Sequence, residues 1–338
     1  MVAAIRYCRP EGAGRVAFSA VGSGPVLMLD PGWVTHLRAQ LEVAAFREFV
    51  RVLAEHFTVV RFDKPGCGLS DRDGAGGGFE AQVAAALAVA DAVPAKRFSV
   101  FGASQGGQVA LALAARCPDR VEGLVLFGTC ANGADLASVP VRDALLRLVS
   151  AHWGLGSKVL ADMFIPGSDP AELEAFANLQ RASATADVAT DLLALYYATD
   201  LSDLLPRVRA RTAVLHREGD TATAFDLGRR VAAGIPGAVL IPLAGTAHLF
   251  YAGESRSVLE ATLDFLRPAA ASAALLTPRE LSVSRLVAAG LTNHAIATQL
   301  GIAPRTVDTH VENIRRKLGV RSRAQIAAWV TENSPRWD

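Results

Sequence analysis

Short apolar runs alternate with longer amphipathic stretches along most of the chain. Each run is short, apolar and followed by turn or polar residues, which predicts buried β-strands. The predicted strands are Val26–Asp30, Thr58–Asp63, Phe98–Phe101, Gly123–Phe127 and Thr212–Leu215. Apolar residues at helical spacing between them predict helices at Ala44–His56, Glu80–Val93, Gly107–Cys117, Ala224–Ile235 and Ser257–Leu266. This order predicts an α/β fold with a mostly parallel sheet, and Arg15–Val21 is expected to be an antiparallel edge strand.

The alternation stops between residues 131 and 206. Helical spacing continues there without any strand pattern, so we expect a helical cap inserted over the ends of the strands. The apolar stretches that carry this spacing are Leu145–Val149, Leu160–Ile165, Leu173–Leu179 and Leu192–Tyr197.

The length and composition suit two domains with sizeable cores. The chain has 338 residues, of which 51% are hydrophobic. No apolar run is long enough to span a bilayer, and the first twelve residues lack the apolar stretch of a secretory signal. The four cysteines show no C-x-x-C spacing, which argues against a zinc site or a disulfide framework. We therefore expect a cytoplasmic protein without a metal or other cofactor.

The net charge is unevenly distributed along the chain. Residues 275–338 contain nine Lys and Arg against five Asp and Glu, whereas the remainder contains 25 against 28. A basic tail favours an anionic partner such as DNA, although a solvated helical face is the alternative. The predicted domains are 1–268 and 276–338, and the small-residue stretch 269–275 is the predicted linker.

A sharp turn with a serine follows one of the predicted strands. Phe98–Phe101 runs into Gly102-Ala103-Ser104-Gln105-Gly106 and then into a helix, which is the strand–turn–helix context of a G-x-S-x-G nucleophile elbow. Glycines flank such a serine because its strained backbone leaves no room for neighbouring Cβ atoms. We expect Ser104 to be a nucleophile beside a helix N-terminus that favours negative charge.

An acid and a base follow Ser104 in the order that this kind of triad requires. Asp220 comes after the strand Thr212–Leu215, and His248 lies in a later loop. Both fall at the strand-end edge of the sheet that carries Ser104, so we predict a catalytic relay of Ser104, His248 and Asp220. The alternatives are that Asp220 caps the next helix and that His248 is a buried core histidine. His216 is a rival imidazole, but it precedes the acid.

Residues 15–268 resemble the α/β-hydrolase superfamily. Asp63–Ser70 looks like the family's loop after the second parallel strand, and Asp30-Pro31-Gly32-Trp33 occupies the place of its His-Gly oxyanion loop. The resemblance implies an α/β-hydrolase fold with a helical cap. It also implies that the backbone N–H groups of Trp33 and Gln105 form the oxyanion hole. Pro31 replaces the family's histidine in that loop.

The C-terminal segment begins with a complete helix start signal. Thr277 is expected at the N-cap, Pro278 at the first helical position and Glu280 at the position that completes a capping box. A second helix is predicted at Asn293–Leu300, a third at Arg305–Leu318 after a turn at Gly301, and a fourth after Ser322. Two short helices around a glycine turn indicate a helix-turn-helix, whose second helix enters the major groove of DNA.

The third helix is expected to present a polar face opposite an apolar one. Residues 276 to about 330 closely resemble the LuxR-type response-regulator tail, which implies a second, small all-α domain that binds double-stranded DNA as a homodimer. A protein-binding helical bundle is the alternative. Asp308 and Glu312 stand where that family often has basic residues. The expected DNA-binding residues are Arg305, Thr306, Asp308, Thr309, Glu312, Asn313, Arg316, Lys317 and Arg321.

These predictions lead to three hypotheses about function. The first is a transcription regulator whose hydrolase-like domain senses, and is equipped to hydrolyse, a small and largely apolar ligand. The second is an active serine esterase, lactonase or C–C hydrolase with a DNA-binding tail. The third is that the first domain is only a dimerisation scaffold. A complete triad also suits a receptor without turnover, so the residues leave the first two hypotheses open.

Overall fold

The structure is a computed structural model that describes residues 4–11, 14–72, 77–266, 276–318, 320 and 322–333. The chain divides into two compact units, Met1–Thr262 and Leu263–Asp338. The linker predicted at 269–275 and Arg321 lie outside the described residues, and so do residues 268 and 338, at which the two predicted domains end.

An eight-stranded sheet forms the centre of the first unit. Its described strands lie in the order β1-β2-β4-β3-β5-β6-β7-β8. All neighbours from β4 to β8 pair in parallel, which confirms the predicted α/β class. The strands are β1 (Arg6–Cys8), β2 (Val16–Val21), β3 (Val26–Asp30), β4 (Thr58–Phe62), β5 (Phe98–Ala103), β6 (Val121–Phe127), β7 (Arg211–Arg217) and β8 (Val239–Leu243).

The expectation of an edge strand at Arg15–Val21 is wrong. β2 pairs antiparallel with β4, as expected, but β1 pairs with its other side and forms the edge. β1 has only three residues, which is too short for an alternating pattern to be recognised in the sequence.

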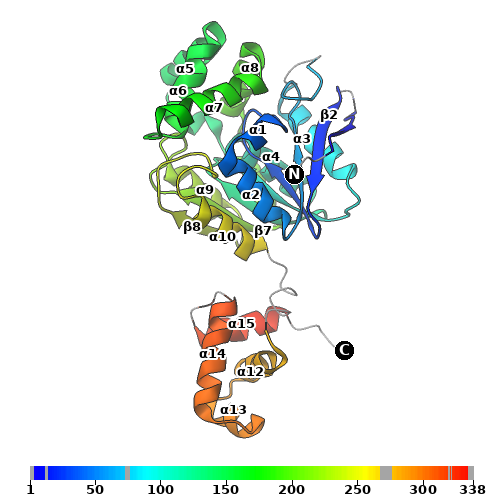
Figure 1. The fold of residues 1–338 in the computed structure, drawn as a ribbon, viewed down its shortest axis with the longest axis vertical. Helices are drawn as coiled ribbons and strands as arrows, with labels where there is room; N and C mark the ends of the chain where they lie inside the picture. Colours follow the sequence, from blue (N-terminus) through cyan, green and yellow to red (C-terminus); the bar gives the residue numbers. More distant parts are fainter. Residues whose placement is uncertain are drawn as a thin grey trace. The chain divides into compact units, whose positions relative to one another are not determined.

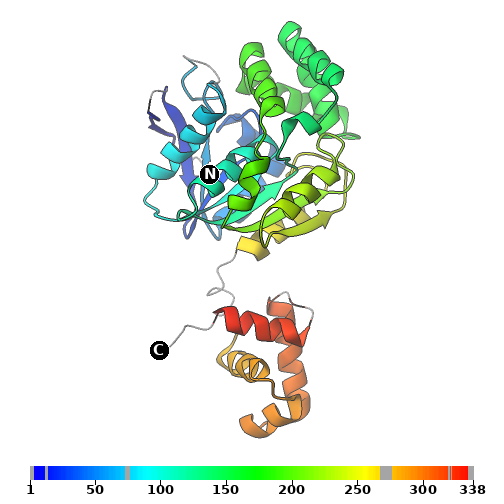
Figure 2. The same ribbon diagram turned by 180° about the vertical axis from the view of Figure 1, so that it is seen from behind.

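Helices cover both faces of the sheet. α2 and α10 lie on the face seen in Figure 1, and α3, α4 and α9 lie on the face seen from behind in Figure 2. The helices of this layer are α1 (Ala39–Glu42), α2 (Ala44–Ala54), α3 (Phe79–Asp91), α4 (Gln105–Arg116), α9 (Phe225–Gly234) and α10 (Ser255–Leu266).

Each face of the sheet has its own apolar core. Aliphatic side chains such as Val89, Leu111 and Val231 pack against the strands under α3, α4 and α9. On the other face, the ring of Phe250 lies 4.8 Å from that of Phe49 and 5.0 Å from that of Phe101, measured between ring centroids. Tilted and edge-to-face aromatic side chains of this kind remove large apolar areas from water, so they stabilise the sheet strongly.

The predicted insertion is a cap of four α-helices, drawn in green in Figure 1. A separate apolar cluster, which includes Trp33 of the sheet domain and Leu160 and Leu192 of the cap, joins the cap to the layer below. The cap elements are η1 (Gly133–Asp135), α5 (Val139–Ala151), α6 (Trp153–Phe164), α7 (Pro170–Ser183), α8 (Ala186–Ala198) and η2 (Ser202–Arg207).

The second unit is a small helical domain around its own core. Its described helices are α12 (Pro278–Ala288), α13 (Asn293–Leu300), α14 (Pro304–Leu318) and α15 (Arg323–Asn333). Val283, Ile296 and Ile314 are fully buried in that core. The capping box of Thr277 and Glu280 is present, as predicted, and Gly301 makes the left-handed turn between α13 and α14 with φ +64°.

Candidate functional site

Ser104 lies at a strained turn between β5 and α4. Among the described residues other than glycine, Ser104 alone has a positive φ, of +53°. Backbone strain of this kind persists only where the surrounding structure enforces it. The two flanking glycines are sterically required. A Cβ on Gly102 would lie 2.6 Å from the Gly106 carbonyl oxygen, and a Cβ on Gly106 would lie 2.5 Å from the Asp30 carbonyl oxygen. The turn therefore has the geometry of a nucleophile elbow.

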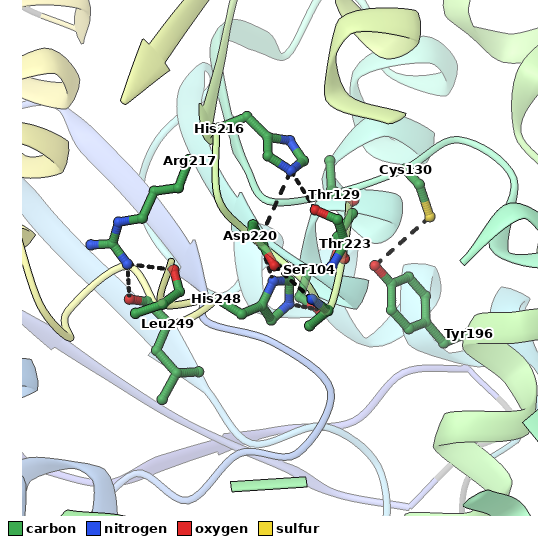
Figure 3. A network of polar contacts seen from close by, with 12 residues as sticks. Ser104, Thr129, Cys130, Tyr196, His216, Arg217, Asp220, Thr223, His248 and Leu249 are labelled. Carbon is green, nitrogen blue, oxygen red and sulfur yellow. Dashed lines mark hydrogen bonds and ion pairs between the residues drawn. The ribbon is translucent and has the colours of Figure 1, made fainter. Parts of the chain in front are cut away.

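The three side chains predicted to form a relay lie in hydrogen-bond contact (Figure 3). His248 Nδ1 donates to Asp220 Oδ2 over 2.7 Å, and His248 Nε2 lies 2.9 Å from the hydroxyl oxygen of Ser104. A carboxylate only accepts hydrogen bonds, so Asp220 fixes the proton on Nδ1 and leaves Nε2 free to accept the Ser104 proton. All three residues are buried, which keeps competing water away.

Asp220 does not cap the next helix, because α9 begins with Ala224 at its N-cap and has no side-chain cap hydrogen bond; Asp220 instead fixes the preceding turn and faces His248. Its Oδ1 accepts hydrogen bonds from the N–H groups of Ala222 and Thr223, while its Oδ2 faces His248. Burial raises the pKa of Asp220, but the charge of His248 and its hydrogen bond outweigh burial and hold the pKa below its ordinary value. Asp220 therefore stays ionised beside the imidazole.

His216 does not join the relay. It lies in β7, and its Nε2 donates to the Thr223 carbonyl oxygen over 2.7 Å while remaining 3.9 Å from Asp220 Oδ2. Burial lowers the pKa of His216, so the ring is neutral and supports the turn that holds Asp220.

Arg217 supports the loop that carries His248, and the sequence analysis missed it. Its guanidinium donates to the carbonyl oxygens of Ala247 and Leu249, at 2.5 and 2.9 Å, and to that of Ala252 at 2.7 Å. These hydrogen bonds hold the backbone on both sides of His248, as Figure 3 shows for Leu249. The only signal in the sequence was an arginine at a strand end three residues before Asp220.

The predicted oxyanion loop lies beside Ser104 and rests on a buried ion pair. Lys64 Nζ lies 3.1 Å from Asp30 Oδ2, and both side chains are buried. The other oxygen of Asp30 accepts the N–H of Gly32 at 3.4 Å. Charges that are removed from water in this way need a partner, so the pair restrains the loop from below.

Trp33 lies near Ser104, and Gln105 follows Ser104 directly in the chain. Gln105 is the first residue of α4, and its side-chain Nε2 donates to the Leu192 carbonyl oxygen of α8 over 2.7 Å. The Trp33 ring packs edge-on against Trp153 of the cap, with 6.0 Å between ring centroids. Their backbone N–H groups remain the predicted oxyanion donors.

A narrow cavity of about 30 Å³ adjoins the relay. Ser104 and His248 line it together with Trp33, Phe164 and Leu179. A cavity of this size holds a water molecule or two, so a larger ligand requires side chains of the cap to move.

Two cap helices contact the relay directly, and sequence reasoning found neither contact. The carbonyl oxygen of Phe164, at the end of α6, accepts the backbone N–H of His248 over 2.6 Å. The hydroxyl of Tyr196, in α8, lies near the side chains of Ser104 and Thr223, and the Cys130 thiol donates to that hydroxyl over 3.8 Å. Burial raises the pKa of Tyr196, so the phenol stays protonated.

The second unit presents most of the predicted DNA-binding residues on the outer face of α14. Asn313 and Lys317 are half-buried, and Lys317 Nζ lies 2.7 Å from Glu280 Oε2, where it ties α14 to the capping box of α12. Arg321 lies outside the described residues. The exposed residues of the predicted set are Arg305, Thr306, Asp308, Thr309, Glu312 and Arg316.

Local hydrogen bonds hold the acidic residues of this face. Asp308 Oδ1 accepts the side-chain amide of Asn293 in α13 over 2.7 Å. Glu312 lies 3.2 Å from Arg315 Nη1 on the same helix. Arg315 offsets part of the negative charge of Glu312, whereas the neutral amide of Asn293 restrains Asp308 without changing its charge.

Two negative observations limit the kinds of site in the described part of the chain. No group of three or more His, Cys, Asp or Glu residues there is arranged to hold a metal ion. No helix there is long and apolar enough to cross a membrane.

Comparison with known proteins identifies both units. Residues 25–156 match the alpha/beta hydrolase fold family, and residues 274–330 match the bacterial regulatory proteins of the luxR family. The solved structure of a bromoperoxidase from Bacillus anthracis is similar with a TM-score of 0.71 and 17% identity, and the match covers 78% of this chain and 100% of that one.

Two curated relatives resemble different parts of the chain. Pimeloyl-[acyl-carrier protein] methyl ester esterase of Nitrosomonas europaea is 32% identical over 145 residues, which are 43% of this chain and 48% of that protein. The nitrate/nitrite response regulator NarL of Escherichia coli is 44% identical over 55 residues, or 16% of this chain and 26% of NarL. The chain spans less than half the length of the curated relatives it matches. It thus joins an α/β-hydrolase-fold domain to a helix-turn-helix domain of the LuxR family.

Proposed function

We propose that this protein is a transcription regulator whose hydrolase-fold domain binds, and hydrolyses, a small and largely apolar ester. One observation carries the proposal. A hydrogen-bonded relay of Ser104, His248 and Asp220 beside a cavity occurs in the same chain as a LuxR-family helix-turn-helix. The regulator binds double-stranded DNA, and it therefore acts in the cytoplasm, where the DNA lies.

The geometry supports acyl transfer to Ser104. The Ser104 oxygen attacks the carbonyl carbon of the ester while His248 Nε2 takes the hydroxyl proton. The N–H groups of Trp33 and Gln105 stabilise the resulting oxyanion, and Asp220 stabilises the imidazolium. The C–O bond to the alcohol then breaks as His248 returns the proton to the leaving oxygen. Water, activated by the same imidazole, releases the acid and restores the serine.

The DNA-binding part of the proposal rests on α14. Arg305 is exposed at the first turn of this helix, where a groove-reading helix makes its first base or phosphate contacts. We further propose that the protein binds a near-palindromic site as a homodimer through α15, where Ala324 and Ala328 are exposed and small enough for close approach. A footprint of a single half-site would contradict the dimer.

A second candidate function is a serine esterase, lactonase or C–C hydrolase whose tail gives feedback on its own pathway. The 2.9 Å separation of His248 Nε2 and the Ser104 hydroxyl oxygen favours it, because a nucleophile and its general base need this hydrogen-bond contact.

A paired experiment on Ser104→Ala distinguishes these functions. Ester hydrolysis and effector-dependent binding to operator DNA are measured for the wild-type and variant full-length proteins. Loss of hydrolysis with a normal DNA response indicates an enzyme with a separate regulatory tail. Loss of both indicates that reaction at Ser104 is the signal. If neither protein hydrolyses esters, the domain is a receptor, and the proposed hydrolysis is wrong.

A further inference from the structure

A second, larger hollow lies beside the relay cavity. This lateral groove encloses about 730 Å³, a volume typical of pockets that bind drug-sized ligands. Its walls come from α1 and the start of α2 on one side, from α7 of the cap on the other, and from residues 249–255 below. Neither the relay nor the oxyanion loop contributes to these walls.

The lateral groove and the relay cavity share a wall. Four side chains line both spaces, namely Phe176, Leu179, Leu249 and Tyr251. The ring of Phe176 also lies 6.1 Å from that of Phe164, which in turn lies 5.2 Å from the ring of His248. Phe176 and Leu179 both have rotatable side chains, and a rotation that opened this wall would join the two spaces and let a ligand at Ser104 reach into the groove.

The chemistry of the groove is apolar with an acidic rim. Small and aliphatic side chains, among them Val43, Ala175 and Leu179, form most of its surface. Glu42 and Glu172 are exposed at its edge, and the described residues that line it include no Lys, Arg or His. An apolar arm gains free energy by leaving water there, whereas an anionic arm meets two carboxylates and no cation.

We propose that the lateral groove binds the uncharged, apolar arm of a carboxylic ester whose carbonyl carbon lies at Ser104, and that it discriminates against anionic arms. This inference rests on the proposed function. It adds the substrate class, a neutral ester with an extended hydrocarbon chain on its acyl or alcohol side. Acidic esters and phosphate-bearing thioesters are disfavoured.

Chain-length dependence tests the groove. Hydrolysis is measured for p-nitrophenyl alkanoates and for alkyl acetates, each from two to ten carbons in the variable arm. In one of the two series kcat/KM rises by about two- to fourfold per methylene, because each buried methylene contributes about 0.8 kcal/mol. If esters are hydrolysed but kcat/KM does not rise with chain length in either series, the groove does not bind the apolar arm, and the proposed function is unaffected.

A variant that fills the groove tests whether the chain-length dependence of kcat/KM arises there. Ala175→Trp places a large ring in the groove, and Ala171→Trp makes the same change at an exposed position of α7 outside the lining. The ratio of long-chain to short-chain kcat/KM falls sharply in Ala175→Trp and is retained in Ala171→Trp. An equal ratio in both variants overturns the inference.

Charge reversal tests the acidic rim. The protein is given methyl octanoate and monomethyl suberate, which differ in a terminal carboxylate. The combined substitution Glu42→Lys and Glu172→Lys reduces the preference for the uncharged ester by about five- to tenfold, as expected for two nearby charges in water. Asp143→Lys on α5, exposed and outside the groove, leaves the preference unchanged. An unchanged preference in the double variant contradicts the charge selection.

Binding without turnover separates failure of the groove from failure of the proposed function. If no ester is hydrolysed, calorimetry measures the binding of methyl octanoate to full-length Ser104→Ala with and without Ala175→Trp. If Ala175→Trp abolishes the binding of methyl octanoate, the groove is the binding site, although the proposed hydrolysis is then wrong. Absent binding, or equal binding by both proteins, overturns the groove as well.

Discussion

Arg217 is a buried cation whose described partners are carbonyl oxygens and an aromatic ring. Within the described residues no carboxylate lies at ion-pair distance from its guanidinium, which instead packs 5.4 Å from the centroid of Phe127. Keeping a charge out of water is expensive, so the three hydrogen bonds to the loop around His248 must be well formed. The imidazole is therefore positioned from behind as well as by Asp220.

Arg217→Gln is expected to impair turnover more than binding. The variant leaves carbonyl oxygens on both sides of His248 without a donor, which costs about 1–3 kcal/mol for each unsatisfied group and lets the imidazole shift. We expect kcat for ester hydrolysis to fall about tenfold or more with little change in KM, because small misplacements of a reacting group slow the reaction strongly.

Arg61→Gln is the matched control for this change. Arg61 is also buried and packs over Phe46, but its guanidinium donates to the Leu37 carbonyl oxygen and not to the backbone beside His248. It should lower stability without a selective loss of kcat. A similar loss of kcat in both variants would show that Arg217 has no positioning function.

The depressed pKa of Asp220 predicts how its stabilising effect depends on pH. Because the folded pKa lies below the ordinary value of about 4, the contribution of Asp220 is fully present above that value and is lost as the pH falls through the folded pKa. The difference in free energy of unfolding between the wild type and Asp220→Asn should therefore be largest near neutral pH and shrink on acidification. Urea unfolding at a series of pH values measures it, and a constant difference is the opposing result.

At the scale of elements, the cap helices are part of the site. α6 holds the backbone of His248, and α8 contacts both Gln105 and Ser104. Tyr196 is the residue of α8 that reaches the nucleophile. A protonated phenol beside the Ser104 hydroxyl restrains its orientation, and the cap thereby contributes to the alignment of nucleophile and base.

Tyr196→Phe is expected to lower kcat by about two- to tenfold, since a single hydrogen bond contributes about 0.5–1.5 kcal/mol. Tyr197→Phe is the control, because Tyr197 lies next to it on α8 and packs near Arg142 instead, at 5.9 Å. Stopped-flow acylation rates with p-nitrophenyl acetate compare the two variants. If both lose the same activity, the effect of Tyr196 is only on the packing of α8.

The sequence was sufficient to predict most of the strands and helices and the proximity of Ser104, Asp220 and His248, and the reason is topological. Ser104, Asp220 and His248 each follow a strand or precede a helix, and parallel strands bring such positions to one edge of the sheet. Contacts that depend on how the cap helices pack against the sheet domain, such as those of Phe164 and Tyr196, produce no periodicity or motif in the sequence. The strand β1 was missed because three residues are too few for an alternating pattern, and the Lys317–Glu280 ion pair because its partners lie 37 residues apart in the sequence.

At the scale of the whole molecule, the two units act as one regulator only if the ligand and DNA affect each other's binding. Linkage requires that any factor by which the ligand changes affinity for the operator equals the factor by which the operator changes affinity for the ligand. Ligand binding by Ser104→Ala, titrated calorimetrically with and without operator DNA, tests this equality without turnover. Factors of one in both directions would leave two independent domains on one chain.

The hydrogen bond between His248 and Phe164 has a consequence for timing. Any displacement of α6 would also pull on the backbone of His248, so a ligand whose entry moved this helix could be cleaved only after the helix had returned. Each ligand that enters in this way requires one opening of the cap. The residence time of the ligand between two such openings then determines whether it is cleaved or released intact.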